Sequence, residues 1–267
     1  MTLVQIIVLA LIQGLTEFLP VSSSAHLILG GKAFGWTDQG LVFDVATHLG
    51  TLFAVFVYFR SELLGRARSC LQPVQTTQDR RHRSMVLYLA LASMPALVVG
   101  FFAHDLVDLY LRDVRIIAWT TIGFGILLWV ADRVSSTERR VRDMNLKSAL
   151  LIGLAQAFAL IPGASRSGVT ITAGRLLGFE RQDAARFSFL LSAPVILLAT
   201  LYKGGELVLG DATVAWGELA LGVAVSAVVA YLSIEFFMRF VTRIGLAPFA
   251  VYRIALAGLI HYLYGGS

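Results

Sequence analysis

The chain has 267 residues, of which 57% are hydrophobic and only 15% are charged. This low charge excludes an ordinary soluble domain, in which about a quarter of the residues are charged, and apolar runs long enough to cross a ~30 Å hydrocarbon core indicate a polytopic membrane protein. The net charge of +5 does not indicate nucleic-acid binding, because the arginines cluster in short loops beside the apolar runs.

The N-terminal 34 residues predict a hairpin that dips into the membrane and returns. Residues 3–19 are apolar but end in Glu17 and Pro20, and residues 21–34 form a second short apolar run. Neither run reaches the ~20 residues that a transmembrane helix needs. We therefore expect a helix, a break and a helix, followed by a first full span at Phe43–Phe59.

Arginine-rich loops set the predicted orientation of the next spans. Loop 60–83 is placed in the cytoplasm by the positive-inside bias, because it carries Arg60, Arg66, Arg68, Arg80, Arg81 and Arg83. Met85–Ala103 then spans outward to an acidic loop, and Ile116–Ala131 returns to a basic cytoplasmic linker at 132–147.

The second half of the chain repeats this pattern. Ser148–Ile161 forms an apolar half-helix, the sequence PGASRSG interrupts it, and a second half-helix continues through Leu177. Three further spans are expected at Phe187–Tyr202, Trp216–Phe237 and Pro248–Tyr264.

These elements predict an all-α polytopic membrane protein whose single membrane domain, residues 1–267, is an inverted-topology repeat. Each half, about 1–131 and about 148–267, is a re-entrant helix-break-helix hairpin plus three transmembrane helices. An odd number of spans turns the second copy upside down, which brings the two hairpin tips together near the midplane. The spacing Pro20-x-x-Ser23 matches Pro162-x-x-Ser165.

The first break, QGLTEFLPVSSSAH, concentrates polar side chains in an apolar segment. Ionisable groups at membrane depth cost about 2.5–3.5 kcal/mol on insertion scales, which makes Glu17 and His26 candidate functional residues. Gln13 and Glu17 lie four residues apart and share a helix face. Ser22 or Ser23 is expected to cap the returning half-helix, whose free N–H groups point into the protein.

The second break, PGASRSGVT, adds a cation to the same arrangement. Ser165 or Ser167 is expected to cap the second half-helix, which places Arg166 in or beside its first turn. Two helix N-termini that face each other, together with a guanidinium fork, form a receptor for a multiply charged phosphate.

Structural interpretations compete with these functional ones. Glu17 and Arg166 could simply neutralise each other as a buried pair. Asp44 and His48 are weaker candidates that form an ordinary i,i+4 pair near the outer end of a span, and Arg175 is expected at the inner membrane interface.

Both breaks resemble the signatures of a known family. QGLTEFLPVSSSAH is similar to the (E/Q)GxTEFLPVSSxxH motif, and PGASRSGVT to the PGxSRSGxT motif, of the undecaprenyl-diphosphate phosphatases, the bacitracin-resistance family. The resemblance covers essentially the whole chain and includes FxxxxHLGTLxAV at Phe43–Val55. It implies hydrolysis of an isoprenoid diphosphate lipid to the monophosphate carrier of cell-wall precursors, in the bacterial cytoplasmic (inner) membrane, at an active site open toward the periplasm.

The resemblance also implies the site residues and a cofactor. Functional positions of the family fall on Glu17, Ser23, His26, Ser165, Arg166 and Thr170, with Ser22 adjacent. With the two breaks considered together, Glu17, Ser23, His26 and Arg166 are the expected catalytic residues, and Ser22, Ser165, Ser167, Thr170 and Gln13 the expected phosphate-binding residues. The family is described as needing a divalent cation, Mg²⁺ or Ca²⁺, for which Glu17 is a candidate ligand. Many members have a glutamate where this chain has Gln13, which puts a metal site of two carboxylates in doubt.

The nucleophile stays open at this stage. Ser23 is the first choice, with His26 as its base or as the acid for the leaving monophosphate, and Glu17 either orients His26 or holds the metal. The alternatives are His26 itself, through a phosphohistidine, and a water molecule activated by Glu17 and the metal.

Two other functions compete with hydrolysis by this family's route. Acid-phosphatase-like lipid phosphatases need a histidine six residues after the arginine of their SR motif, where this chain has Thr172. A lipid-phosphate or anion transporter would use the same broken helices, but a carrier does not need a base beside a hydroxyl group. Membrane lipids are further expected partners, and Gly217–Gly222 suggests either a homodimer interface or close packing inside one subunit.

Overall fold

The computed structural model describes residues 1–23, 25–27, 35–36, 40–110, 113–136, 139–209 and 215–264. The helices of the first half are α1 (Leu3–Thr16), α3 (Gly40–Tyr58), α4 (Arg60–Leu71), α5 (Thr77–Tyr110) and α6 (Val114–Val134). After the short η1 (Val141–Asp143), the second half contains α7 (Leu146–Ala157), η2 (Phe158–Leu160), α8 (Arg166–Leu176), α9 (Arg181–Leu209), α10 (Trp216–Ile244) and α11 (Ala247–Tyr264). Most of the predicted return run 21–34 lies outside the described residues.

The helices confirm an all-α polytopic membrane protein. Among the described residues, α5, α6, α9 and α10 are each long and apolar enough to cross a membrane. The pair α3 and α4 passes the same test together but is bent by 78°. α11, with 18 residues, corresponds to the last predicted span.

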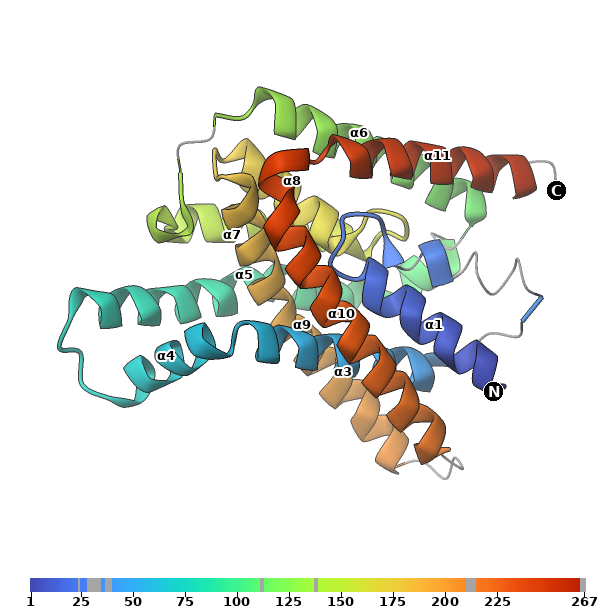
Figure 1. Cartoon of the computed structure of the whole chain (residues 1–267), viewed down its shortest axis with the longest axis horizontal. Coiled ribbons are helices and arrows are strands. Elements are labelled where there is room, and N and C mark those ends of the chain that lie inside the picture. The colour runs from blue at the N-terminus through green and yellow to red at the C-terminus, as the bar shows by residue number, and fades with distance from the viewer. Residues whose placement is uncertain are drawn as a thin grey trace.

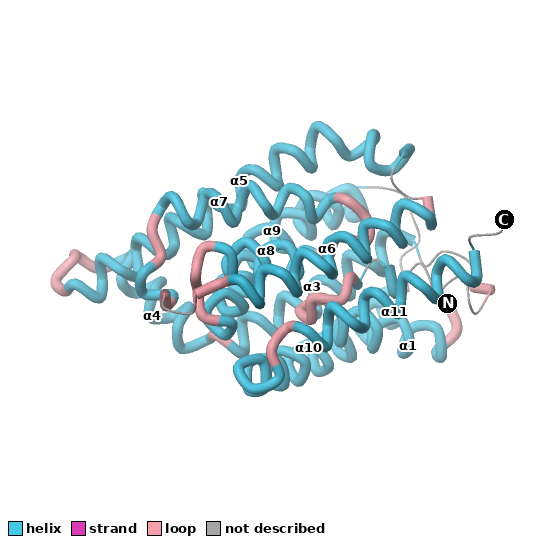
Figure 2. Tube along the Cα trace, turned by 90° about the horizontal axis from the view of Figure 1, so that it is seen from above, coloured by secondary structure: helices cyan, strands magenta, loops and turns pink. Residues whose placement is uncertain are grey.

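Two segments that were predicted as loops are helical. The prediction of a loop at 60–83 is wrong, because α4 and the first turns of α5 form a helical hairpin there. The Arg83 side chain donates hydrogen bonds to the carbonyls of Ser69 and Gln72, which stabilises the end of α4. Likewise, α5 continues past Ala103 to Tyr110, into the predicted acidic loop. The hairpin projects from the end of the molecule opposite the start of α1 and the end of α11 (Figures 1 and 2).

The helix pairs of the first half recur in the second half when each helix is replaced by its counterpart. α1 packs on α10, and its counterpart α7 packs on α5; α3 packs on α10, as α9 packs on α5. α3 contacts its counterpart α9, and α6 lies beside its counterpart α11 (Figure 1). A repeat with a two-fold axis predicts this pattern. The repeat boundaries and the orientation in the membrane stay predictions.

Small residues bring the paired backbones together. A Cβ atom on Gly50 would lie 2.1 Å from Ser226 Oγ, and one on Gly153 would lie 2.3 Å from the Ala92 carbonyl oxygen. Only glycine therefore allows these contacts of α3 with α10 and of α7 with α5.

We expect Gly50→Ala to lower the free energy of unfolding by about 1–3 kcal/mol, because the added methyl group must push α3 away from α10. Thermal unfolding of the detergent-purified protein measures this effect. Gly123→Ala on α6 is the matched control, since a Cβ there meets nothing within 4 Å. Equal stability of the two variants would contradict the close contact.

Candidate active site

The first break begins where α1 ends. Thr16 is the last residue of α1, and the amide of Glu17 still donates to the Gln13 carbonyl at 3.0 Å. Residues 17–21 form a turn, and Ser22 adopts a left-handed backbone with φ of 72°. The described residues that follow, 23 and 25–27, are helical. The predicted break is thus confirmed, with its start at Thr16 rather than at Pro20.

The second break has the same backbone at its cap. Ser165 has φ of 70°, and its hydroxyl accepts a hydrogen bond from the Gly168 amide at 3.2 Å, so that α8 begins at Arg166. Gly163 has φ of 90°, and a Cβ there would lie 2.3 Å from Thr120 Oγ1, so only glycine fits. The predicted cap by Ser165 and the place of Arg166 in the first turn are confirmed.

Three landmarks recur 143 residues apart in the two halves. They are the helix N-caps Thr2 and Asn145, the buried glutamines Gln13 and Gln156, and the left-handed serines Ser22 and Ser165. The proline spacing had matched Ser23 with Ser165. That match is wrong by one residue, because the backbone pairs Ser22 with Ser165.

The two breaks meet through a buried ion pair. Arg166 Nη2 donates to Glu17 Oε1 at 2.9 Å, and both side chains are largely buried. The Ser167 hydroxyl adds a second link by donating to the Leu19 carbonyl at 3.0 Å. Arg166 Nη1 also donates to the Ser188 carbonyl of α9 at 3.1 Å. The predicted meeting of the two stretches is confirmed.

The Glu17 carboxylate collects further partners on its other oxygen. Gln13 Nε2 and Ser23 Oγ donate to Oε2 at 2.9 and 3.0 Å. His48 Nε2 lies 3.7 Å from the same oxygen, and His48 Nδ1 donates to the Asp44 carbonyl at 2.7 Å. His48 therefore faces the site and was underrated by the sequence analysis, although the FxxxxHLGTLxAV pattern includes it.

His26 has different neighbours from those expected. Its Nδ1 lies 2.7 Å from the Ser22 carbonyl and its Nε2 lies 2.6 Å from the Tyr252 hydroxyl of α11. The expected contact with Ser23 or Glu17 is not among its hydrogen bonds in the described part of the chain. The ring instead stacks on Tyr252, with centroids 5.6 Å apart and planes 2° from parallel.

Thr170 lies deeper in α8 than a phosphate-binding role suggests. Its hydroxyl is buried, donates to the Arg166 carbonyl at 2.8 Å, and lies 2.6 Å from Ser188 Oγ. It therefore holds the first turn of α8 against α9. Ser165 and Ser167 stay closer to the tip, with their hydroxyls 3.3 Å apart.

Arg253 of α11 is the main residue that the sequence analysis missed. It is fully buried, and it donates to the carbonyls of Thr121, Gly163 and Ala164 at 3.1, 2.8 and 3.0 Å. A longer contact of 3.4 Å reaches the Pro20 carbonyl. One guanidinium thus binds both breaks. The signal was present, since an arginine inside an apolar span is a functional suspect.

Arg175 is fully buried in the protein, and its predicted position at the inner membrane interface stays a prediction. Its Nε donates to Asp132 Oδ1 at 3.1 Å, and Arg181 Nε donates to the same oxygen at 2.7 Å. The other Asp132 oxygen accepts from the Leu246 amide at 3.2 Å. This cluster joins α6, α8, α9 and the start of α11, and it plays a structural part.

Gln13 leaves one oxygen atom without a partner. It is fully buried, and its Oε1 accepts no hydrogen bond from the described residues. The described residues contain no group of three or more histidine, cysteine or carboxylate side chains that could hold a metal ion. An amide oxygen and one carboxylate are therefore the oxygen ligands available at this point.

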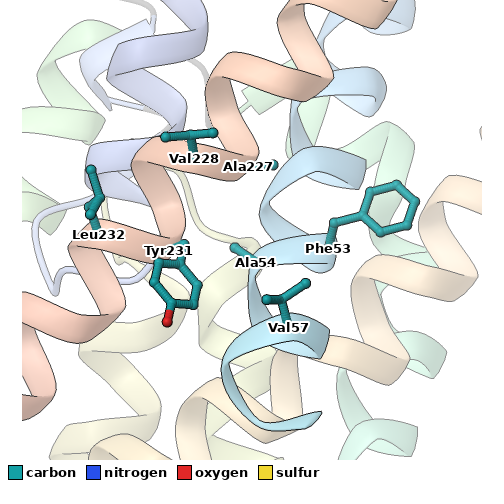
Figure 3. A pocket seen from close by; sticks show the side chains of 7 residues that line it. All are labelled: Phe53, Ala54, Val57, Ala227, Val228, Tyr231 and Leu232. Atoms are coloured by element: carbon teal, nitrogen blue, oxygen red, sulfur yellow. The ribbon is translucent and has the colours of Figure 1, made fainter.

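An apolar pocket of about 310 Å³ lies apart from these polar groups. Its lining comes from α3 and α10, namely Phe53, Ala54, Val57, Ala227, Val228, Tyr231 and Leu232 (Figure 3). None of the residues that meet at the breaks lines it.

Comparison with known proteins identifies relatives over nearly the whole chain. The family model described as Bacitracin resistance protein BacA matches residues 6–259. A protein of Teredinibacter turnerae named undecaprenyl-diphosphatase is 52% identical over 260 residues, which are 97% of this chain and 98% of the relative. One of the same name from Alcanivorax borkumensis is 53% identical over 94% of this chain and 95% of its own. Undecaprenyl-diphosphatase 2 of Stutzerimonas stutzeri is 49% identical over the full length of both.

We expect Arg253→Met to lower the free energy of unfolding by about 2–4 kcal/mol, because it leaves buried carbonyl groups of both breaks without donors. Thermal unfolding in detergent is the measurement. Arg142→Met, at a side chain that is 66% exposed, should change stability by less than about 0.5 kcal/mol. If the two variants unfolded alike, Arg253 would not hold the breaks together.

Proposed function

We propose, since the chain belongs to the bacitracin resistance protein BacA family, that it hydrolyses undecaprenyl diphosphate to undecaprenyl phosphate and inorganic phosphate. This reaction recycles the lipid carrier for cell-wall synthesis. The observation that carries the proposal is the junction of Glu17, Ser23 and Arg166 at two facing helix breaks. A lipid-phosphate carrier would need the cation and the helix ends, but not a hydroxyl group bound to a carboxylate.

Phosphate binding follows from the two helix starts. Ser22 and Ser165 precede the half-helices, whose first N–H groups have no partner within the helix and favour anions. Arg166, in the first turn of α8, adds a planar fork that matches two phosphate oxygens. Together these donors stabilise the charge that develops on the terminal phosphate during its transfer.

Ser23 is the nucleophile that the contacts favour. Its hydroxyl already donates to Glu17 Oε2, so the carboxylate accepts the proton as Ser23 Oγ forms a bond to the terminal phosphorus. The bond from phosphorus to the bridging oxygen breaks, and undecaprenyl phosphate leaves. Water then attacks the phosphoserine: as the bond from phosphorus to Ser23 Oγ breaks, Glu17 returns its proton to Oγ and accepts a proton from the attacking water, and inorganic phosphate leaves. Glu17 then loses that proton to solvent, which restores the carboxylate. His26 and a directly attacking water remain the rival nucleophiles, which the Ser23→Ala variant separates.

A divalent cation, Mg²⁺ or Ca²⁺, fits the oxygen atoms at Glu17. The unpartnered Oε1 of Gln13 and the Glu17 carboxylate would hold it, and Mg²⁺ commonly binds through one or two protein oxygens plus substrate phosphates. When bound, the cation would offset the negative charge of the diphosphate.

The site belongs in the bacterial cytoplasmic (inner) membrane and opens toward the periplasm in this proposal. The positive-inside bias supports this orientation, because the arginine-rich α4–α5 hairpin projects opposite the start of α1 and the end of α11 (Figure 1). A homodimer through Gly217–Gly222 stays a prediction.

We expect the detergent-purified protein to release phosphate from undecaprenyl diphosphate, and Arg166→Ala to lower kcat about 10²–10³-fold by removing a charge-stabilising donor. Ser23→Ala should lower kcat about 10⁴-fold or more if Ser23 is the nucleophile. The control is Arg142→Ala, with thermal unfolding checked for every variant. A folded wild-type protein without phosphate release would reject hydrolysis, and substantial release by Ser23→Ala would reject Ser23 as nucleophile.

We expect Gln13→Glu to tighten Mg²⁺ or Ca²⁺ binding about tenfold or more, since affinity for these hard cations rises with the number of charged ligands. Isothermal titration calorimetry on the free protein measures it without relying on activity. Gln5→Glu, which adds the same charge in the first turn of α1 at a partly exposed side chain that accepts from the Thr2 amide, is the control. Unchanged affinity in Gln13→Glu would remove Gln13 from the cation site.

A further inference from the structure

Both ring nitrogens of His26 are engaged, which limits what this imidazole can do directly. The Ser22 carbonyl can only accept a hydrogen bond, so Nδ1, at 2.7 Å, carries a proton and donates it. In the neutral ring, Nε2 is then the acceptor, and the Tyr252 hydroxyl donates to it at 2.6 Å. The nitrogen that would act as acid or base therefore faces Tyr252 and not Ser23.

Tyr252 is held firmly where the two breaks meet. The next residue on α11, Arg253, donates to carbonyls of Pro20, Gly163 and Ala164. This anchoring fixes the backbone that presents Tyr252, and the parallel stacking on His26 fixes its ring. The Tyr252 residue stays 45% exposed. A ligand can therefore approach this positioned residue.

We propose that the Tyr252 hydroxyl donates the proton to the leaving lipid monophosphate, and that His26 Nε2 then reprotonates the Tyr252 oxygen. This inference rests on the proposed hydrolysis and assigns a further catalytic residue to it. It also gives His26 a role that its contacts allow, since Glu17 already serves Ser23.

The proton transfer balances as follows. Before the step, His26 carries protons on both nitrogens, and its Nε2–H donates to Tyr252 Oη. As the bridging bond to phosphorus breaks, its electron pair moves to the bridging oxygen, which takes the Tyr252 proton. The Nε2 proton passes to Oη at the same time. Tyr252 ends as a neutral phenol and His26 as the neutral ring, which then regains a proton from water.

The charged groups of α11 and of the two breaks have partners other than Tyr252 among the described residues. Arg253 follows Tyr252 on α11, Glu17 belongs to the first break, and Arg166 begins α8. Glu17 and Arg166 pair with each other, and the described partners of Arg253 are carbonyl groups. The Tyr252 hydroxyl therefore has His26 as its proton source.

The test is phosphate release from undecaprenyl diphosphate by Tyr252→Phe, which keeps the stacked ring and removes the hydroxyl. We expect kcat to fall about 10²–10³-fold, the range for a general acid, with KM changed less than about threefold. In the relay, wild-type kcat should fall at alkaline pH as His26 loses the Nε2 proton that it passes to Tyr252, and this fall should be absent in Tyr252→Phe. Tyr262→Phe, on the same helix with an 85% exposed side chain, should behave as wild type.

A double-mutant cycle with His26→Ala separates a relay from two independent roles. In a relay, the double variant should lose no more kcat than the worse single variant. Losses that multiply, Tyr252→Phe kcat within about threefold of wild type, or kcat above wild type would each overturn the proposal. Absence of release by the folded wild-type protein would instead reject the hydrolysis itself.

Discussion

The carbonyl groups released by two helix breaks are the constraint on which the rest of this structure depends. Inside a membrane, a backbone carbonyl without a donor costs several kcal/mol, and water is not available to supply one. Arg253 supplies donors to these carbonyls from a single planar guanidinium group, whose five N–H donors are fixed in direction. Its bonds to Gly163, Ala164 and, at longer range, Pro20 hold both breaks to α11. Tyr252, the residue before Arg253 on α11, is thereby held beside the first break, where its hydroxyl meets His26.

The two halves share one frame but contribute different chemistry. At the offset of 143 residues, Glu17 corresponds to Leu160 and His26 to Val169, while Ser23 corresponds to Arg166. The first break thus supplies the carboxylate, the hydroxyl and the imidazole, and the second supplies the guanidinium. Neither break alone could bind and attack a phosphate. The equivalent backbones, with Ser22 and Ser165 both left-handed, bring the two incomplete sets together.

Local signals in the sequence were enough to predict the breaks and their caps. Proline, glycine and serine have strong local backbone preferences, so the cap by Ser165 and the place of Arg166 could be predicted. The pairing of Glu17 with Arg166 followed from the high energy of isolated charges in a membrane. The arginines of loop 60–83 indicated its side of the membrane but not its conformation, because the positive-inside bias acts on charge whether the segment is helical or not.

Contacts between distant helices could not be predicted in the same way. The partner of His26 comes from Tyr252, 226 residues later, and no local pattern specifies how α11 is rotated about its axis. His48 faces Glu17 because α3 and α1 both pack on α10 and also contact each other. The burial of Arg175 against Asp132, 43 residues earlier on α6, was likewise not visible in the sequence. Such side-chain directions depend on the packing of whole helices.

In the site without substrate, the charges of Glu17 and Arg166 neutralise each other, so a diphosphate can bind Arg166 only by competing with Glu17. Arg166 is bound to Glu17 and to the Ser188 carbonyl, so the phosphate competes with a carboxylate for the guanidinium. If Arg166 turned wholly to the phosphate, Glu17 would be left buried without its cation, which is strongly unfavourable. For the proposed divalent cation, a carboxylate already shared with a guanidinium would be a weak ligand, and the remaining oxygen ligands would be those of the diphosphate. Under that proposal, cation and substrate would stabilise each other's binding, and Gln13, by lowering the negative charge of the site, would favour their joint binding over binding of the cation alone.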